Sequence, residues 1–342
     1  MKKLSNIVKW QAFWPIMILL GIILFNVIIT GGSFLEMKIV DHHLYGRMID
    51  IIRNGSKLML LSIGLTLVLA TGGTDISVGS VMAISGAIAC SIVSGSLLAG
   101  AGQNVFIAIL IAVLAGVICG AWNGFLVSRI KIQPIVATMI LMVAGRGIAQ
   151  LITNGKIVTV NSEAYYFING GYIFGLPFPL YIVGFALLIT LLITKKTAFG
   201  LFLTSTGCNA NASKFTGINV SKIKFLVYAG SGALAAIAGL IESAGIKGAD
   251  CNNAGLMIEL DAILAVAIGG TSLNGGRFSI PSSIVGALII QSITTTVYAI
   301  GVPPEIIQVI KAILVIIICL FQSKEFKNTL MRKLWIRGEA QG

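Results

Sequence analysis

The residues best placed to do chemistry stand in one short polar break, residues 71–77, between two strongly apolar runs. Gly72 and Gly73 release the backbone from helical φ and ψ, and Asp75 adds a charge that is expensive near lipid. Irregular backbone at membrane depth persists only where protein or a water-filled cavity satisfies its polar groups. The break therefore indicates either a broken helix lining a solute path or a tight turn at the membrane surface. Its candidate pathway residues are Thr71, Gly72, Gly73 and Asp75.

Three further charges, Arg146, Glu242 and Lys311, fall inside apolar runs. Counted at about 1.5 Å per residue, all three lie in the outer half of the membrane. We expect them to line or brace the outer mouth, with Glu242 as the partner of one cation, unless Lys311 snorkels to the headgroups.

A neutral solute needs only a few polar groups to pass, and side-chain amides in the membrane can supply them. The alternative is that these amides form hydrogen bonds between helices. The candidate amides of the solute pathway are Asn123, Gln150, Asn252, Asn253 and Gln291.

The sequence contains no recognisable catalytic or metal-binding constellation. It has no G-x-x-x-x-G-K-[ST] phosphate loop, so it cannot hydrolyse ATP by that route. His42 and His43 are its only histidines, and adjacent residues diverge on a helix, which disfavours a metal site. The five cysteines are scattered without paired spacing. We expect no catalytic residue, no metal and no cofactor.

Composition assigns the chain to the membrane proteins. Of 342 residues, 56% are hydrophobic and 11% charged, and the mean hydropathy is +0.97. Such a chain buries its surface in lipid rather than in one soluble core. The 24 Lys and Arg residues exceed the 12 acidic ones, but they sit in short segments between apolar runs, as orientation signals do. The sequence therefore predicts an all-α polytopic integral membrane protein and no nucleic-acid partner.

The apolar runs predict about ten transmembrane helices, some short or broken, in one membrane domain over 10–322. The expected spans are 10–29, 58–71, 76–98, 104–127, 132–153, 176–194, 223–244, 258–272, 280–300 and 305–322. Residues 31–57 are expected to be an amphipathic surface segment. With residues 1–9 and the basic tail 323–342 in the cytoplasm, 16 Lys and Arg residues lie inside and six outside, which favours cytoplasmic termini.

The segment LVLATGGTDISVG at 67–79 recurs loosely as AVAIGGTSLNGG at 265–276. This echo indicates a duplicated half, as in transporters built from repeats. The alternative is that similar glycine-rich breaks arose twice independently, because glycine is frequent in membrane helices.

The inner loop 195–224 is basic, and residues 210–216 within it could form a short helix bounded by Gly207 and Gly217. Phe215 and Ile218 would be its apolar points. Such a helix could dock on a soluble partner, or the loop could be a solvated connector whose lysines only fix topology.

Four segments in order, TGGTDISVGSVMAISGA (71–87), WNGFLVSRIKIQPIVATMILMVAGRGIAQLI (122–152), GCNANASKFTGINV (207–220) and ELDAILAVAIGGTSLNGGR (259–277), carry a family resemblance. Together they resemble the permease subunit of bacterial sugar ABC importers of the ribose/xylose/galactose type. The segments 131–153 and 248–266 look most like its galactofuranose-importing branch. Departures from the family pattern are Thr74, Asn211, Cys251 and Phe278.

The resemblance implies a permease in the bacterial inner membrane that moves a monosaccharide from periplasm to cytoplasm. It implies three partners beside membrane lipid: a cytoplasmic ABC ATPase, a periplasmic sugar-binding protein and a second permease subunit, identical or homologous. The residues that it places at the ATPase are Gly207, Asn209, Lys214, Phe215, Gly217 and Ile218. Two alternative functions are distinguished by their expected residues. An ATPase-independent secondary transporter should show paired mid-span carboxylates, and a membrane enzyme should show a nucleophile or a set of metal ligands.

Overall fold

The computed structural model describes residues 13–29, 32, 34–40, 43–97, 104–301, 303, 306, 309, 311–313 and 316. The chain forms two compact units, 1–291 and 292–342. All the sites discussed below lie in the first unit. Lys311 lies in the second.

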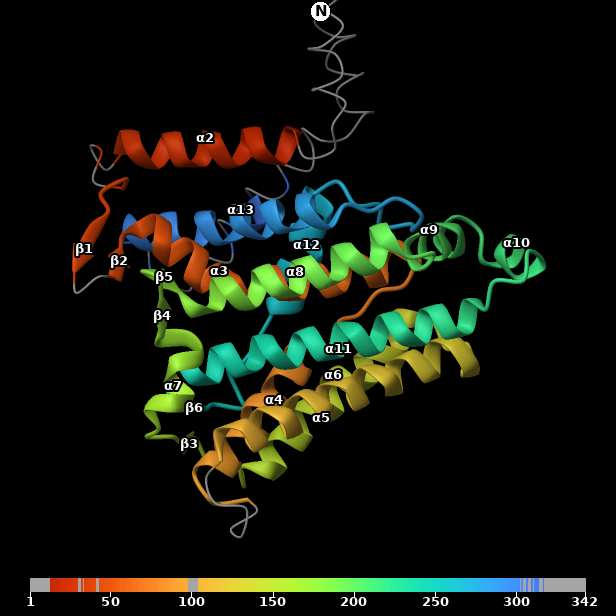
Figure 1. Cartoon of the computed structure of the whole chain (residues 1–342), viewed down its shortest axis with the longest axis horizontal. Coiled ribbons are helices and arrows are strands. Elements are labelled where there is room, and N and C mark those ends of the chain that lie inside the picture. The colour runs from red at the N-terminus through yellow and green to blue at the C-terminus, as the bar shows by residue number, and fades with distance from the viewer. Residues whose placement is uncertain are drawn as a thin grey trace, which may run out of the picture. The chain divides into compact units, whose positions relative to one another are not determined.

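The described part of the chain is predominantly helical (Figure 1). Its helices are α2 (Phe13–Ile29), α3 (Arg47–Ala70), α4 (Val78–Val93), α5 (Val105–Phe125) with a π-helical turn (Leu126–Ile130), α6 (Pro134–Ile152), α7 (Glu163–Gly170), α8 (Phe178–Lys196), α9 (Phe199–Cys208), α10 (Ala210–Phe215), α11 (Val220–Gly245), α12 (Ile258–Ile268) and α13 (Ile280–Ala299). Short antiparallel pairs join β1 (Lys38–Val40) to β2 (His43–Tyr45), β3 (Val158–Thr159) to β6 (Gly248–Ala249) and β4 (Tyr172–Ile173) to β5 (Leu176–Pro177).

Among the described residues, six helices are long and apolar enough to cross a membrane: α3, α5 with its π-turn, α6, α8, α11 and α13. This confirms a helical, multi-pass membrane protein. Nine of the ten expected spans coincide with a helix, and the tenth, 305–322, falls mostly outside the described residues. The number ten itself stays a prediction.

The prediction for residues 31–57 was wrong in its second half. Helix α3 begins at Arg47 and runs for 24 residues, so the second span is neither short nor preceded by a long surface segment. Its charged residues, Arg47, Asp50, Arg53 and Lys57, lower the local hydropathy, yet Ile49 and Ile51 between them are buried. The eighth span is short as expected, because α12 has 11 residues.

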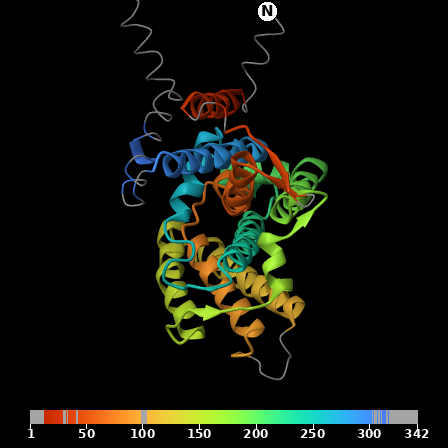
Figure 2. The ribbon, with the colours of Figure 1, turned by 90° about the vertical axis from the view of Figure 1, so that its left-hand side faces the viewer.

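Helix α4 forms the centre of the first unit, with every side chain but Ile88 buried. It contacts α5, α6 and α11, and α11 also contacts α3 and α5 (Figure 2). Helices α5 and α11 approach closely because small residues recur every fourth position on α5: Ala108, Ala112, Gly116 and Gly120 are all buried. A Cβ on Gly116 would lie 2.6 Å from the Gly232 carbonyl oxygen.

The opposite face of α5 is a stripe of exposed apolar side chains, Phe106, Leu110, Leu114, Ile118 and Trp122. Exposed apolar residues at every fourth position fit a helix with one face on protein and the other on lipid.

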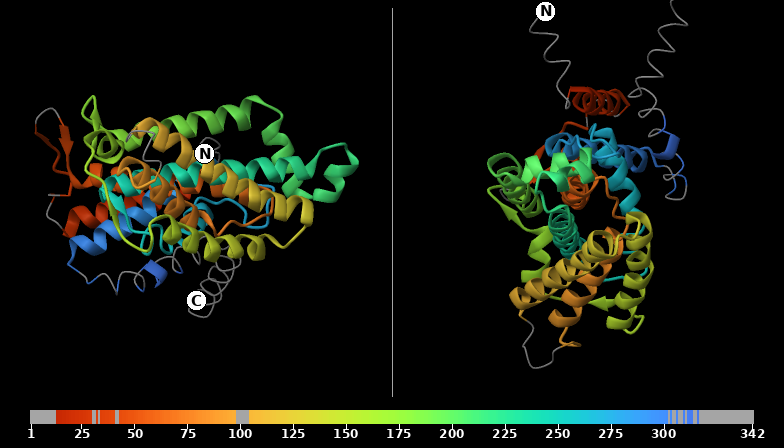
Figure 3. Two further views of the ribbon diagram at one scale, coloured as in Figure 1. Left: turned by 90° about the horizontal axis from the view of Figure 1, so that it is seen from below. Right: turned by 90° about the vertical axis from the view of Figure 1, so that its right-hand side faces the viewer.

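The long helices of the first unit run side by side, so the unit has two ends (Figure 1). The end that carries α9, α10 and the turn between α5 and α6 is called the α10 end. The end that carries α7, β3 and β6 is called the α7 end. Figure 3 shows that α10 projects beyond the helices at its end.

Candidate functional site

The polar break between α3 and α4 is non-helical from Gly73 to Ser77, as expected. The hydroxyl of Thr71 donates to the Val68 carbonyl at 2.7 Å, and Gly72 adopts φ +73°, which favours glycine. Gly73 has no room for a side chain, because a Cβ there would lie 2.6 Å from the hydroxyl of Tyr228. That hydroxyl donates to the Thr74 carbonyl at 3.1 Å. A side chain of α11 thus satisfies one backbone carbonyl of the break.

Asp75 is fully buried and ties the break to two other helices. One carboxylate oxygen accepts from the backbone N–H of Ser77 at 3.0 Å and from its hydroxyl at 2.7 Å. The other accepts from the hydroxyl of Ser231 on α11 at 3.2 Å. Asn123 on α5 donates from its side-chain nitrogen to the Ser77 hydroxyl at 2.8 Å. This Asp75 network joins α4, α5 and α11, so Thr71, Asp75 and Asn123 lie among packed helices.

The two glycine motifs of the sequence echo meet at the α10 end. The N–H of Gly276 donates to the carbonyl of Ala70 at 3.0 Å. A Cβ on Gly275 would lie 2.9 Å from the backbone nitrogen of Gly72 and 2.9 Å from the Gly207 carbonyl oxygen. The ends of α3 and α9 and the loop after α12 therefore share one contact point that only glycines fit. The duplication itself stays a prediction.

The second group of predicted residues comes together at the α7 end. Arg146 on α6 donates from one guanidinium nitrogen to three carbonyls of the loop before α12: Ala254 at 2.6 Å, Cys251 at 3.0 Å and Asn252 at 3.4 Å. Gln150, one turn further along α6, donates to the side-chain oxygen of Asn252 at 2.7 Å. Residues 250–254, here called the outer loop, are thus held on α6 by two side chains.

Asp250, which the sequence reasoning missed, organises the outer loop from within. Its carboxylate accepts from the side chain of Asn253 at 2.7 Å and from the backbone N–H groups of Asn252 and Asn253. The Asn253 side chain, the two N–H groups and nearby Arg146 hold the pKa of Asp250 below its usual value. An anion therefore stands beside exposed amides at this surface. The sequence signal was Asp250-x-Asn252-Asn253, an Asx-turn pattern.

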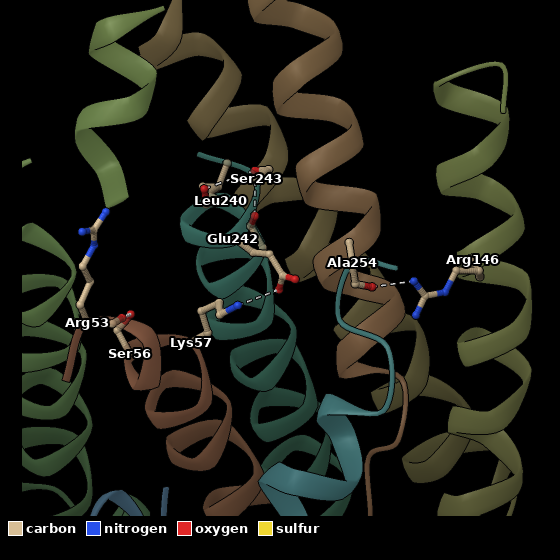
Figure 4. A network of polar contacts seen from close by, with 9 residues as sticks. Arg53, Ser56, Lys57, Arg146, Leu240, Glu242, Ser243 and Ala254 are labelled. Carbon is tan, nitrogen blue, oxygen red and sulfur yellow. Dashed lines mark hydrogen bonds and ion pairs between the residues drawn. The ribbon is translucent and has the colours of Figure 1, made fainter. Parts of the chain in front are cut away.

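Glu242 faces the outer loop from α11, but its ion-pair partner is Lys57 on α3 (Figure 4). The nitrogen–oxygen distance is 3.6 Å, and the side chains are 29% and 19% exposed. Glu242 is thus the partner of a cation, as expected, but that cation, Lys57, is not among the intramembrane charges singled out from the sequence. Arg146 lies on the far side of Ala254 and serves backbone carbonyls instead (Figure 4). A cavity of about 10 Å³, enough for about one water, lies between Glu242, the outer loop and Gly86 of α4.

The predicted ATPase-facing segment contains the expected short helix, α10, whose N-terminus is capped by Asn209. The Asn209 side chain accepts from the N–H groups of Asn211 and Ala212, both at 3.0 Å. Phe215 is 92% exposed, and Lys214 beside it is exposed. Gly217 ends the segment at φ +84°, while Ile218 is half-buried.

Gly207 does not bound the short helix, which corrects one prediction. It lies inside a further helix, α9, that the sequence reasoning took for connector. A Cβ there would collide with the Ala70 carbonyl oxygen and the Gly276 nitrogen. Gly207 is thus a close-packing residue rather than a turn residue.

Two other residues of the site, Tyr228 and Ser231, were also missed. Both lie on α11, more than 150 positions after the break that they contact. No local pattern pairs them with it. Among the described residues, no group of three metal-binding side chains was found.

Residues 47–319 match the family model described as "Branched-chain amino acid transport system / permease component". The chain is 46% identical over 318 residues to the galactofuranose transporter permease protein YtfT of Escherichia coli (strain K12), covering 93% of this chain and 92% of that protein. It is 41% identical over 306 residues to the fructose import permease protein FruF of Bifidobacterium longum (strain NCC 2705), covering 87% and 84%. It is 35% identical over 282 residues to the ribose import permease protein RbsC of E. coli (strain K12), covering 81% and 86%.

These matches cover the break, the outer loop and α10 together, and they agree with a multi-pass inner-membrane protein. Permeases of such importers are transport components rather than enzymes, and they work with ATPase and substrate-binding partners. The chain belongs to this family of ABC importer permeases, among sugar permeases.

Proposed function

We propose that this chain is the permease subunit of an ABC importer that moves galactofuranose, or a closely related monosaccharide, from periplasm to cytoplasm. The observation that carries the proposal is the 46% identity to a galactofuranose permease along 93% of the chain. The fructose and ribose permeases are less similar, at 41% and 35%. All three relatives are named for a monosaccharide, and the identity is highest for the galactofuranose permease, so we favour that sugar over fructose and ribose.

The α10 end faces the cytoplasm in this proposal, and both termini are cytoplasmic. Support comes from the charges. Segment 195–224 contains five lysines and no acidic residue, and the turn between α5 and α6 at the same end carries Arg129 and Lys131. Cytoplasmic loops are enriched in Lys and Arg, so this end fits the inner face.

The partners follow from this orientation. The cytoplasmic ATPase docks on α10, where Phe215 and Lys214 are exposed, and the periplasmic sugar-binding protein docks at the α7 end. A second permease subunit, identical or homologous, completes the membrane core. Arg146, Gln150, Glu242, Asn252 and Asn253 form the outer entrance for sugar, since they gather beside the outer loop. The Asp75 network, with Thr71, Gly72, Gly73 and Asn123, braces the helices that must move.

Sugar uptake in a strain that lacks this chain tests the proposal. We expect re-expression to restore saturable galactofuranose uptake, with weaker fructose and ribose uptake, and only when the partner ATPase has an intact phosphate loop. Stronger uptake of another sugar than of galactofuranose would overturn the sugar assignment. Uptake that survives loss of the ATPase, or uptake of branched-chain amino acids in place of sugar, would overturn the sugar importer itself.

A further inference from the structure

A long groove of about 480 Å³ opens between α8 and α11, over Leu67 of α3. Figure 1 shows the two helices side by side and antiparallel, facing the viewer. Its α8 wall is formed by Ile182, Phe185, Ala186, Ile189, Thr190, Ile193 and Thr194, with Phe199 beyond them. Its α11 wall is formed by Leu226, Val227, Gly230, Ala233, Leu234 and Ile237. None of these residues belongs to the sugar entrance or to the Asp75 network.

The groove surface is apolar throughout. Its two threonines turn their hydroxyls back to their own helix: Thr190 donates to the Ala186 carbonyl at 2.8 Å, and Thr194 to the Thr190 carbonyl at 2.7 Å. Both hydroxyls are therefore occupied within α8, and Phe185 on the same wall is 65% exposed. A sugar would find no free donor or charged group on these walls, whereas a hydrocarbon chain meets matching surface.

The length of the groove matches one leaflet of a bilayer. From Ile182 to Thr194 the α8 wall is about 18 Å long at about 1.5 Å per residue. Half of a hydrocarbon core about 30 Å thick is about 15 Å. One acyl chain of the leaflet at the α10 end would therefore occupy most of the groove.

Two lysines continue the groove walls at the α10 end. Lys196 follows Ile193 by three positions on α8, and Lys222 precedes Leu226 by four on α11, so each lies on the face of its helix that lines the groove. Both are exposed. No acidic residue occurs anywhere in segment 195–224 to neutralise them.

We propose that this groove is a binding site for an anionic phospholipid, with one acyl chain between α8 and α11 and the headgroup phosphate at Lys196 and Lys222. Basic pockets between membrane helices at the cytoplasmic surface bind anionic headgroups for the same electrostatic reason. The two lysines favour a lipid with an anionic headgroup, because an apolar helix from a second copy would supply no anion for them. The site is independent of which sugar the protein carries.

Tryptophan quenching by brominated lipid tests the site directly. The four native tryptophans are replaced, and a single probe is introduced as Phe185→Trp in the groove or Ile118→Trp on the lipid-facing stripe of α5. The two positions are 65% and 67% exposed, and each stands eleven residues before a basic residue of the α10 end, Lys196 or Arg129. The protein is reconstituted in phosphatidylcholine with rising fractions of brominated phosphatidylglycerol.

We expect the groove probe to be quenched at a much lower phosphatidylglycerol fraction than the stripe probe. Each of Lys196→Gln and Lys222→Gln should raise the fraction needed about fivefold, because a lysine at the surface contributes about that factor. Equal quenching curves for the two probes would mean contact with bulk lipid only and would overturn the site. A groove probe that no brominated lipid quenches would mean that protein covers the groove, which also overturns it.

Native mass spectrometry of the otherwise unchanged chain gives a second measurement if the tryptophan variants fail to insert. We expect phosphatidylglycerol to stay bound after extraction and to be lost in the Lys196→Gln/Lys222→Gln variant. The control is Lys156→Gln, an exposed lysine at the α7 end, which should retain the lipid. Retention in the double variant, or equal loss in the control, would overturn the proposal.

Discussion

Asp75 accepts hydrogen bonds from three donors where the chain leaves helical geometry: the backbone N–H and the hydroxyl of Ser77, and the hydroxyl of Ser231. Asp75→Ala removes the acceptor and leaves the donors of Ser77 and Ser231 buried without a partner. Each stranded group costs about 1–3 kcal/mol. We expect a clear drop in the melting temperature of the purified protein, with a smaller drop for Asp75→Asn, which keeps one acceptor oxygen. Equal melting temperatures in Asp75→Ala and wild type would contradict the network.

The ion pair between Lys57 and Glu242 yields a prediction that distinguishes it from a pairing of Glu242 with Arg146. At 3.6 Å and about a quarter exposed, the pair should couple by about 0.5–1 kcal/mol after solvent screening. In a double-mutant cycle, Lys57→Gln and Glu242→Gln should therefore be non-additive in unfolding free energy. Arg146→Gln combined with Glu242→Gln should be additive, because Arg146 binds carbonyls of the outer loop instead. Coupling found only in the second cycle would refute the assignment.

At the scale of elements, the close approach of α5 and α11 depends on glycines that tolerate no side chain. A Cβ at Gly120 would collide with the Tyr228 carbonyl oxygen, whereas a Cβ at Gly147 on α6 meets nothing within 4 Å. We expect Gly120→Ala to destabilise the fold by about 1–3 kcal/mol as an overpacking change. The matched Gly147→Ala should be neutral or slightly stabilising, because alanine favours helix. Thermal unfolding of the two variants in one detergent compares them; similar losses would mean that α5 and α11 can move apart.

Helix α10 is expected to hold the ATPase through Phe215, which makes little contact with its own chain at 92% exposure. Removing its ring by Phe215→Ala should leave thermal stability unchanged but weaken ATPase binding by about 2 kcal/mol, or about 30-fold, as for an interface anchor. Gly217→Val should act through backbone strain at φ +84°, which costs about 1 kcal/mol or more. Phe174→Ala is the matched control, since Phe174 is 95% exposed in the turn between β4 and β5.

Pull-down of the ATPase on each purified variant provides the measurement. Wild-type ATPase binding in Phe215→Ala would leave α10 a connector. A loss as large in Phe174→Ala would show that the effect is not local to α10.

Hydropathy located the helices well, because a helix that faces lipid needs a long apolar run. Helices α5, α6 and α8 accordingly begin and end within a few residues of their expected bounds. It failed for the first turns of α3, where four charged residues lower the local hydropathy although Ile49 and Ile51 between them are buried. It also failed for α9, which is too short and too mixed to stand out from a loop.

The contacts within the site were harder to predict from the sequence than the residues that form it. The polar break, the outer amides and α10 were all identified by residue type, since each departs from its apolar surroundings. Their partners were not, because Ser231 and Tyr228 meet the break, and Lys57 meets Glu242, across separations of more than 150 positions. Only packing in three dimensions chooses among several possible cations and hydroxyls.

For the whole molecule, the proposed function requires the α10 end and the outer loop to lie on opposite sides of the membrane. The prediction is tested in a variant without the five native cysteines, carrying one new cysteine at exposed Asn253 or at exposed Asn211. An impermeant maleimide added to cells with an opened outer membrane should label Asn253→Cys at once. It should label Asn211→Cys only after the inner membrane is permeabilised, because the lysine-rich segment around it is retained in the cytoplasm. Labelling of both from one side would contradict the crossing of α11 between them, and the reverse pattern would place the lysines outside and remove the surface on which a cytoplasmic ATPase could dock.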